Sequence, residues 1–362
     1  MSADPLSELL RAVRLRGAIF YYVDGIAPWV AEAPAAREIA SAILPGAEHL
    51  IEYHVVTQGN CWGAIAGEAP VALSAGDVIM FPQGDAHVIS SAPGMRVPKV
   101  DRSLFFSPRP PQLPFVLTQL GERTIPTEAL GDVPTTARLD GGGQERATVV
   151  CGFLGCDARP FNPLLAALPR LLHMPSADDR RNWITPFIEV AVEEANRKRP
   201  GGEAVLERIS EMMFVDVVRR YLESLPTEQT GWLAGLRDRF VGRALGLLHE
   251  RPAHHWTIDA LGDAVGLSRS ALHERFAQLV GQPPMQYLAQ WRMQLASRLL
   301  LESTMNVASV ALETGYESEA AFNRAFKRFV GMPPATWRRA RTKGGTPRDP
   351  AAATDTKALA SV

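Results

Sequence analysis

With 362 residues, 46% of them hydrophobic and 21% charged, the chain is too long for one ordinary core and has the composition of a globular protein of two or three domains. No apolar run reaches the ~18–20 residues that a membrane span requires, and the first residues lack the apolar segment of a signal peptide, so a cytoplasmic protein without a membrane partner is expected. The net charge of −1 is unevenly distributed: residues 231–348 carry 16 Lys and Arg against nine Asp and Glu, which predicts a polyanion partner for that third alone.

Residues 17–106 have the pattern of β-strands. Short apolar or alternating runs are separated by Gly, Pro, Asn and Asp, and the run at 148–156 is predicted to return a strand to the same sheet. Many short strands with tight turns predict a sandwich or a barrel.

A motif in this region has a recognisable spacing. Residues 76–87, GDVIMFPQGDAH, place Gly76, Pro82, Gly84 and His87 in the order G-x5-P-x-G-x2-H. This resembles the second motif of the cupin family, a strand-turn-strand of a small β-barrel whose His is a metal ligand in cupin enzymes. Upstream, PGAEHLIEYHVVTQG roughly matches the first cupin motif, with Glu52 in place of its first His and without its downstream Glu. The resemblance implies a cupin-like sensor domain over 1–160.

Four residues of this domain are candidates for an effector pocket. Glu52 and His54 share one face of their strand because side chains alternate with period two. The candidates are Glu52, His54, Trp62 and His87. Glu52, His54 and His87 are also candidate metal ligands; the alternative is a barrel core with hydrogen-bonded histidines, and no cofactor is assigned.

The three cysteines, Cys61, Cys151 and Cys156, form no disulfide framework and no paired zinc pattern. Reduced thiols are therefore expected. Cys61 and Cys151 are further candidates, as additional metal ligands or as a redox pair.

From Asn162 the apolar period becomes helical, and 161–230 is predicted to be a helical linker. Its two main helices, within 183–225, have a strongly apolar face. The resemblance implies a helical pair that forms a homodimer; the alternative is that the helices only pack on the barrel. The residues predicted to form the dimer face are Ile188, Val192, Leu206, Ile209, Met213, Val217 and Tyr221.

The C-terminal third contains one unit twice. SRSALHERFAQLVGQPP (268–284) and SEAAFNRAFKRFVGMPP (318–334) are identical at seven of seventeen positions, and each follows a short helix that ends at a glycine, Gly266 or Gly315. The glycines are 49 residues apart and the following serines 50, so one residue is inserted in the second turn. This pattern predicts two helix-turn-helix units, about 258–279 and 307–330. The alternative, a helical solenoid, needs about three or more repeats.

The second copy resembles the C-terminal signature of the AraC/XylS family of bacterial transcription regulators. The resemblance rests on ALETGYESEAAFNRAFKRFVGMPPATWRR and covers about 235–340. It implies a DNA-binding domain over 231–341 whose two recognition helices enter successive major grooves, roughly 34 Å apart. We expect the segment 231–345 to fold alone and bind DNA, and the tail 342–362 to be disordered.

The family's base-facing positions carry over to seven residues: Ser270, His273, Glu274, Glu319, Ala320, Asn323 and Arg324. By their chemistry Arg324 suits guanine, Asn323 adenine and Glu274 cytosine. For Arg324 the alternatives are a phosphate contact and an ion pair within the domain. Arg269, Lys327 and Arg328 are candidate phosphate contacts.

The sequence thus predicts an α+β multidomain protein: a cupin-like β-barrel, a helical dimerisation segment and an all-α domain with two helix-turn-helix motifs. The predicted function is sequence-specific transcription regulation without enzymatic activity. The predicted partners are double-stranded DNA, a second copy of the chain and a small-molecule or redox effector, with RNA polymerase a further candidate; activation is more usual in the family than repression. The alternative is a metal-dependent cupin enzyme, a dioxygenase or isomerase, with an accessory helical domain.

Overall fold

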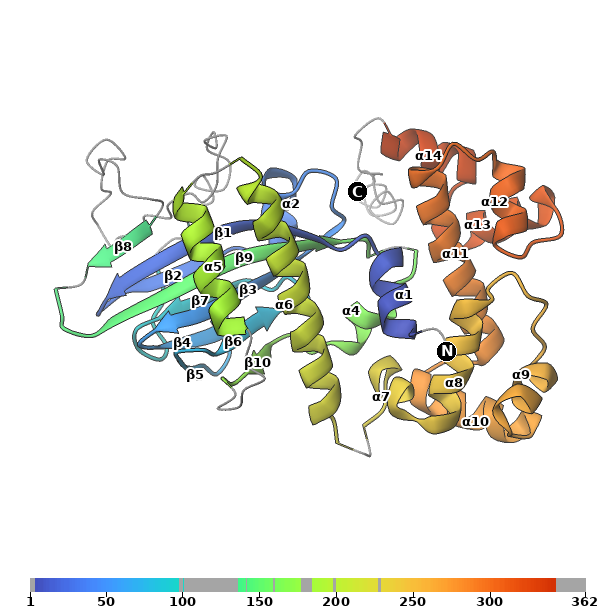
Figure 1. The fold of residues 1–362 in the computed structure, drawn as a ribbon, viewed down its shortest axis with the longest axis horizontal. Coiled ribbons are helices and arrows are strands. Elements are labelled where there is room, and N and C mark those ends of the chain that lie inside the picture. Colours follow the sequence, from blue (N-terminus) through green and yellow to red (C-terminus); the bar gives the residue numbers. More distant parts are fainter. Residues whose placement is uncertain are drawn as a thin grey trace, which may run out of the picture. The chain divides into compact units, whose positions relative to one another are not determined.

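The computed structural model describes residues 4–97, 100, 136–140, 142–158, 160–176, 184–197, 200–226 and 229–342 (Figure 1). The chain forms two compact units. The sensor unit comprises residues 15–156 and 168–224, and the helical unit comprises 1–14, 157–167 and 225–362. Among the described residues, no helix has the length and apolar character needed to cross a membrane. The predicted disordered tail lies, from residue 343 onward, outside the described residues.

The sensor unit contains two β-sheets. The six-stranded sheet has the order β10-β6-β3-β9-β1-β8, and the four-stranded sheet has the order β2-β7-β4-β5. Neighbouring strands are antiparallel except for the parallel pair of β1 and β8. The strands are β1 (Arg16–Ile26), β2 (Val30–Ala33), β3 (His49–Gln58), β4 (Asn60–Ile65), β5 (Val71–Ser74), β6 (Val78–Phe81), β7 (His87–Ser90), β8 (Thr136–Asp140), β9 (Arg146–Cys156) and β10 (Leu172–Met174).

A hydrophobic core contains residues from both sheets. Leu50 and Val56 of β3 belong to it together with Cys61 of β4 and Phe81 of β6. The predicted return of 148–156 to the sheet is confirmed, because β9 lies between β3 and β1. The predicted cupin-like fold is therefore present as two packed sheets.

Helices cover the six-stranded sheet (Figure 1). α2 (Ala36–Ile43) contacts β3, while α5 (Ile184–Arg197) contacts α6 (Gly202–Ser224), which in turn packs on β1. Tyr53 of β3 points toward α6, since its hydroxyl lies 2.8 Å from the hydroxyl of Ser210. At Gly17 a side chain would collide with the backbone of Glu207, so α6 approaches β1 too closely for any larger residue.

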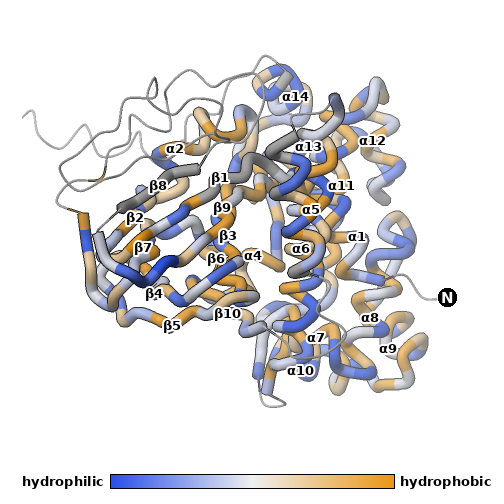
Figure 2. Tube along the Cα trace, turned by 60° about the vertical axis from the view of Figure 1, so that its left-hand side comes forward, coloured by the Kyte–Doolittle hydropathy of each residue, from blue (hydrophilic) through white to orange (hydrophobic). Residues whose placement is uncertain are grey.

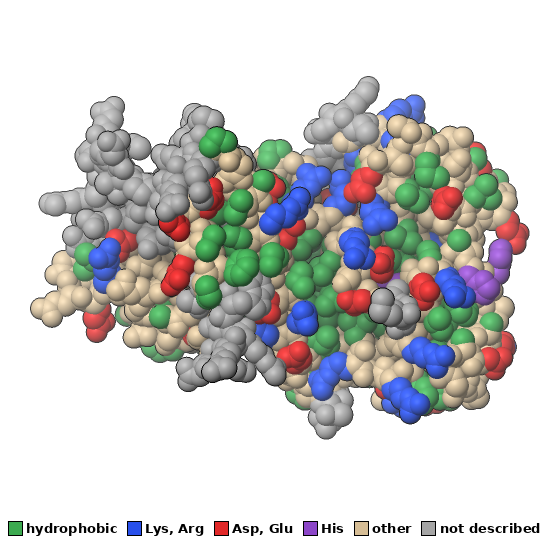
Figure 3. Space-filling view, viewed as in Figure 1, with side chains coloured by type: hydrophobic (Ala, Val, Ile, Leu, Met, Phe, Trp, Pro, Cys, Tyr) green, Lys and Arg blue, Asp and Glu red, His purple; other side chains and the backbone are tan. Residues whose placement is uncertain are grey.

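The predicted dimer face on α5 and α6 needs correction. Most of the predicted side chains are buried within the protomer, where α6 packs on the sheet. Those at most 5% exposed are Ile188, Leu206, Ile209, Met213 and Val217. Other apolar side chains of the same helices are exposed, namely Phe187, Val190, Val205 and Met212. We call these four the α5/α6 patch; hydrophobic side chains gather over these helices in Figure 3.

In the helical unit, hydrophilic and hydrophobic residues are interspersed along each helix (Figure 2). They are α1 (Pro5–Ala12), α4 (Pro163–Ala167), α7 (Trp232–Arg237), α8 (Arg239–Glu250), α9 (Ile258–Val265), α10 (Arg269–Val280), α11 (Pro284–Glu302), α12 (Val307–Glu313), α13 (Glu319–Val330) and α14 (Pro334–Thr342).

Two segments distant in sequence complete the helical unit. α1 contacts α8 and α11, and α4 contacts α7. The buried amide of Gln294 on α11 joins both segments, donating to the carbonyl of Ala12 (2.9 Å) and accepting from the backbone N–H of Phe161 (3.2 Å). Arg14 forms a bidentate ion pair with Asp157, with both distances 2.7 Å. The predicted domains 1–160, 161–230 and 231–341 are continuous in sequence, whereas the compact units are not.

Candidate nucleic-acid interface and sensor core

The first helix-turn-helix unit consists of α9 and α10. Gly266 ends α9 in the left-handed conformation, and the Ser268 hydroxyl caps α10 by accepting from the backbone N–H of Ala271 (3.3 Å). Leu272 and Phe276 are fully buried. The predicted base-facing residues Ser270, His273 and Glu274 are all exposed, as is Arg269, which lies 3.6 Å from Asp259.

The second unit, α12 and α13, repeats this arrangement. Ser318 caps α13 through the backbone N–H of Ala321 (3.2 Å), and Phe322 and Phe326 are fully buried. The predicted insertion is confirmed and is Glu317. The first turn closes with a hydrogen bond from Leu267 N–H to the carbonyl of Gly262, and the second with the equivalent bond from Tyr316 N–H to the carbonyl of Ala311. The second unit then has one more residue, Glu317, before its capping serine.

The exposed face of α13 carries the predicted contacts. Glu319, Ala320 and Arg324 are exposed and Asn323 is half-buried. Lys327 and Arg328 are exposed, the latter with its guanidinium 5.1 Å from the ring centre of Phe329. Within the described part of the chain Arg324 forms no ion pair, so an internal salt bridge does not occupy it there. A single compact unit thus contains two capped helices with polar outer faces.

In the sensor unit, three of the four candidate pocket residues meet between the sheets. The Nε2 atoms of His54 and His87 are 2.6 Å apart, and His87 Nε2 lies 3.7 Å from a carboxylate oxygen of Glu52. The ring of Phe81 stacks on His87 with 3.9 Å between centres. All three polar side chains are at most 7% exposed, so the shared strand face predicted for Glu52 and His54 points into the core.

Burial determines the ionisation of this cluster. It raises the pKa of Glu52 well above its ordinary value and lowers the pKa of His54 well below its own, the latter with help from the charge of His87. It also lowers the pKa of His87 to about 4. Burial thus favours the uncharged form of all three side chains, and a hydrogen bond joins the two imidazoles.

These three side chains do not fit a metal ion as they are arranged. Imidazole nitrogens bind zinc at ~2.0–2.1 Å, so two of them on a tetrahedral ion are separated by roughly 3.3 Å. The observed 2.6 Å between His54 and His87 is instead a hydrogen-bond distance. Among the residues that the structure describes, no group of three or more His, Cys, Asp or Glu is arranged to hold a metal.

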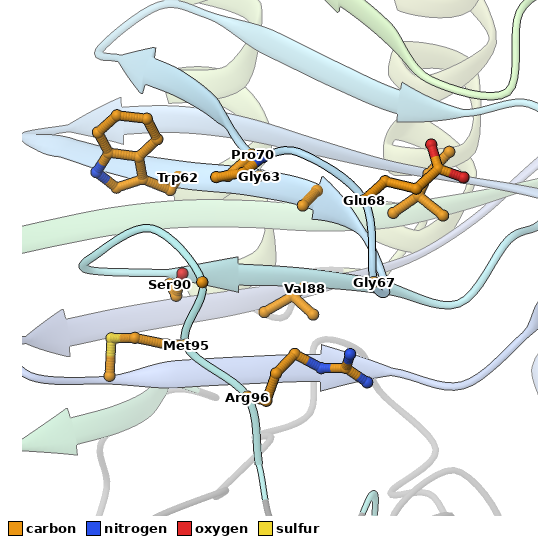
Figure 4. A pocket seen from close by; sticks show the side chains of 12 residues that line it. Trp62, Gly63, Gly67, Glu68, Pro70, Val88, Ser90, Met95 and Arg96 are labelled. Atoms are coloured by element: carbon orange, nitrogen blue, oxygen red, sulfur yellow. The ribbon is translucent and has the colours of Figure 1, made fainter.

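Trp62 is separated from the other pocket candidates. On β4 the core residue Cys61 faces inward, and Trp62 points the opposite way because side chains alternate along a strand. Trp62 lines a surface cavity of about 240 Å³ together with Val88, Met95 and Arg96 (Figure 4). Arg96 is held there by a bidentate ion pair with Glu32. The motif spacing did not point to this cavity, since its lining residues Val88, Met95 and Arg96 belong to no recognised pattern.

The candidate cysteines are buried free thiols. His54 and Cys151 are direct neighbours across β3 and β9. Burial raises the pKa of Cys61 to about 12 and raises that of Cys151 well above its ordinary value. Because the thiolate is the reactive form, both thiols are weak nucleophiles at neutral pH in this conformation.

The sensor cluster predicts a dependence of stability on pH. A His whose pKa is lowered on folding contributes stability that is present above about pH 6.5 and lost as the pH falls toward its folded pKa. Glu52 has the opposite effect: because its pKa is raised on folding, its contribution to stability is present below about pH 4.5 and is lost as the pH rises toward its folded pKa. Because burial lowers the pKa of both histidines, the protein is expected to lose stability as the pH falls from about 6.5 toward 4, with a partial offset from Glu52.

His87→Gln is expected to reduce this acid sensitivity, since it removes a buried imidazole whose pKa is lowered to about 4. Urea unfolding of the sensor unit at pH 7, 6 and 5 measures the slope. His273→Gln, an exposed change on α10, serves as the matched control and should keep the wild-type slope. An unchanged slope in His87→Gln would contradict the assignment.

A sheet-rich, cupin-like unit joined to a helical unit with two helix-turn-helix motifs defines a DNA-binding transcription regulator. A family model described as cupin matches residues 4–223, and one described as helix-turn-helix domain matches residues 261–340. An AraC-like transcription regulator of Streptomyces lividans is 30% identical over 337 residues, covering 93% of this chain and 98% of that protein. The chain belongs to the AraC-like transcription regulators.

Two further relatives carry functional names. The transcriptional regulator AlkR of Acinetobacter baylyi (strain ATCC 33305 / BD413 / ADP1) is 27% identical over 92% of this chain and 99% of its own length. The transcriptional activator RclR of Escherichia coli (strain K12), described as RCS-specific, is 29% identical over 56% of this chain and 71% of its own length.

Proposed function

We propose that the chain regulates transcription as a homodimer, with α10 and α13 of each protomer entering successive major grooves of an operator. The observation that carries this proposal is the pairing of two capped recognition helices within one compact unit. Both present polar outer faces, and α11 connects them. A partner that is chromosomal DNA supports a cytoplasmic location.

The proposed division of contacts follows from side-chain chemistry. Arg324 suits the two acceptors of guanine, Asn323 the edge of adenine and Glu274 the amino group of cytosine. Ser270, His273, Glu319 and Ala320 complete the base-facing set. Arg269, Lys327 and Arg328 are assigned to phosphates, which position the protein without reading the sequence.

Arg324→Ala is expected to weaken binding to the best site by about 1–3 kcal/mol and to relax preference at one base pair. Glu274→Ala should change the preference in the other half of the site, about ten base pairs away. The measurement is in vitro selection from random duplex DNA with the full-length chain, followed by titration of single-base variants. Lys327→Ala is the matched control and should weaken binding to all sequences alike. If Arg324→Ala also does so, Arg324 is a phosphate contact.

The dimer proposal rests on the α5/α6 patch. Phe187, Val190, Val205 and Met212 are 36%, 50%, 40% and 45% exposed, although each is a large apolar residue on a helix. Contiguous apolar surface of this kind on a folded protein marks an interaction site. A second copy is the proposed occupant, because the helical pair is the dimer element of the architecture that the chain resembles and a self-complementary patch closes a two-fold dimer.

The sensor proposal is that a small-molecule or redox signal alters the cluster of Glu52, His54 and His87. Two of its polar atoms, Glu52 Oε1 and His54 Nδ1, are buried without a hydrogen-bond partner in the described part of the chain. Unpartnered buried polar atoms cost free energy, and a ligand or a shift in conformation that satisfies them would be favoured. The cavity beside Trp62 is a separate candidate entry for a signal.

The names of the relatives support regulation in preference to catalysis, so we propose that the chain is not an enzyme. The rival, a metal-dependent cupin enzyme, needs a set of ionised or lone-pair ligands around one metal. The hydrogen bond between the two histidines, with their Nε2 atoms 2.6 Å apart, disfavours it, and burial raises the pKa of Glu52 and so disfavours the ionised carboxylate. We further propose activation, as in the E. coli relative, with RNA polymerase as the additional partner.

A further inference from the structure

Arg292, in the middle of α11, contacts the loop before the first helix-turn-helix unit and the turn of the second. Its guanidinium Nε donates to the carbonyl of Pro252 (2.7 Å) and its Nη2 donates to the carbonyl of His254 (2.9 Å). Both carbonyls belong to the loop that leads into the first unit. The same guanidinium lies 5.9 Å from the ring centre of Tyr316, which forms the turn of the second unit.

On the side of the first unit, the loop that Arg292 holds is short and internally bonded. His254 N–H donates to the carbonyl of Arg251 (3.2 Å), and Trp256 N–H donates to the carbonyl of His254 (2.8 Å). Thr257, the next residue, caps α9 through the backbone N–H of Ala260 (3.0 Å). A displacement of this loop is therefore passed to α9 and to the recognition helix α10 that follows.

On the side of the second unit, Tyr316 connects Arg292 to the recognition helix. The ring of Tyr316 contacts Phe322 of α13 edge to face, with 5.4 Å between centres, and Phe322 is fully buried. Gly315 lets the turn approach the loop: its φ is +81°, and a side chain there would lie 2.7 Å from the Cα of Ala253 and 2.9 Å from Arg292 Nη2. The loop before the first unit and the turn of the second therefore meet at Arg292.

We propose that Arg292 is the positioning residue that sets the spacing and rotational phase of the two recognition helices of one protomer. It would thereby set the number of base pairs between the two groove segments, here called half-sites, that the protomer reads. α11 fixes the separation of the two units along its own axis, and both units pack on it. A planar guanidinium that binds the loop before the first unit by two directed hydrogen bonds, and the turn of the second unit by a ring contact, further restrains the relative tilt of the two units. This inference rests on the proposed reading of two successive grooves.

One base pair of insertion rotates one half-site by roughly 34–36° and shifts it by about 3.4 Å. The wild-type chain is therefore expected to bind a site lengthened or shortened by one base pair roughly 10-fold or more weakly than the selected site. Arg292→Met removes both hydrogen bonds while keeping an unbranched apolar stem. It should reduce that discrimination to about 3-fold or less, while single-base preferences inside each half-site stay as in wild type. Arg292→Lys keeps the charge but loses the planar fork, so its spacing discrimination should lie between those of the wild type and Arg292→Met.

The experiment titrates the full-length chain with the duplex selected in vitro by the wild type and with versions of it changed by one base pair between the half-sites. Arg338→Met is the matched control. Arg338 also donates to two backbone carbonyls, of Leu300 (2.7 Å) and Met305 (2.6 Å), but both lie at the end of α11 and just before α12. This control should lower affinity without changing the spacing ratio.

Tyr316→Leu removes the aromatic ring that Arg292 contacts and introduces the residue found at the equivalent position of the first unit, Leu267. It should reduce the spacing ratio even if Arg292→Met fails to fold. Unchanged spacing discrimination in folded Arg292→Met, or in Tyr316→Leu, would overturn the inference. A wild type indifferent to spacing would overturn the two-groove proposal itself, and the inference with it.

Discussion

Leu9→Ala is expected to destabilise the helical unit by about 2–5 kcal/mol, although residue 9 precedes the first helix-turn-helix unit by some 250 residues. Leu9 is fully buried on α1, which contacts α8 and α11. Shortening it leaves a cavity in that core, and the cost combines lost transfer free energy with the cavity. Hydrogen exchange should show faster opening of the backbone amides of α8 and α11, with weaker binding to the selected DNA.

Leu10→Ala is the matched control, since it removes the same atoms from a neighbouring, half-buried side chain of α1. It should destabilise the helical unit clearly less than Leu9→Ala does. Equal effects of the two substitutions, or loss of protection confined to the strands of the sensor unit, would show that α1 does not belong to the core of the helical unit.

A double substitution in the α5/α6 patch, Val190→Glu with Met212→Glu, is expected to weaken dimerisation by at least ~100-fold. Both side chains are about half exposed in the protomer, so the change need not disturb its core. In a dimer the carboxylates would be buried without partners, at a cost of about 3–5 kcal/mol for each uncompensated charge. Sedimentation over a concentration series measures the monomer–dimer equilibrium.

Arg37→Glu with Ser41→Glu supplies the control, because it adds carboxylates at two exposed positions of α2. That variant should dimerise as the wild type does. A wild type that is monomeric at all concentrations, or a patch variant that dimerises normally, would contradict the use of this surface. A monomeric patch variant that keeps its melting temperature would support it.

The helix-turn-helix units show how much of the site could be predicted from the sequence. The predicted ranges 258–279 and 307–330 agree with α9–α10 (Ile258–Val280) and α12–α13 (Val307–Val330). The signals are local: helical spacing of Leu272 and Phe276, a capping Ser268 and a left-handed Gly266 all act within a few residues. Such short-range patterns are legible without any knowledge of the tertiary structure.

The sensor core was predicted only in part. Glu52, His54 and His87 converge because strand alternation directs them to one side and the motif marks them. Trp62 does not join them, although its parity relative to Cys61 could have placed it on the outer face. The side chains predicted to form the dimer face on α5 and α6 are mostly buried within the protomer, because helical spacing identifies an apolar stripe and does not say whether a sheet or a partner covers it.

The sequence by itself determined the class of protein, the two recognition helices and the inserted residue in the second turn, because each depends on neighbouring residues and on a recognisable motif. Only the tertiary structure decided which distant segments complete each core. Ala12 and Gln294 are 282 residues apart, yet a hydrogen bond joins them, and Arg292 reaches carbonyls 38 and 40 residues away. No periodicity encodes such contacts, since they arise when separate hydrophobic faces pack together and bring their polar groups within bonding distance. The segment 231–345, predicted to fold alone, would lack α1 and the backbone partners of Gln294.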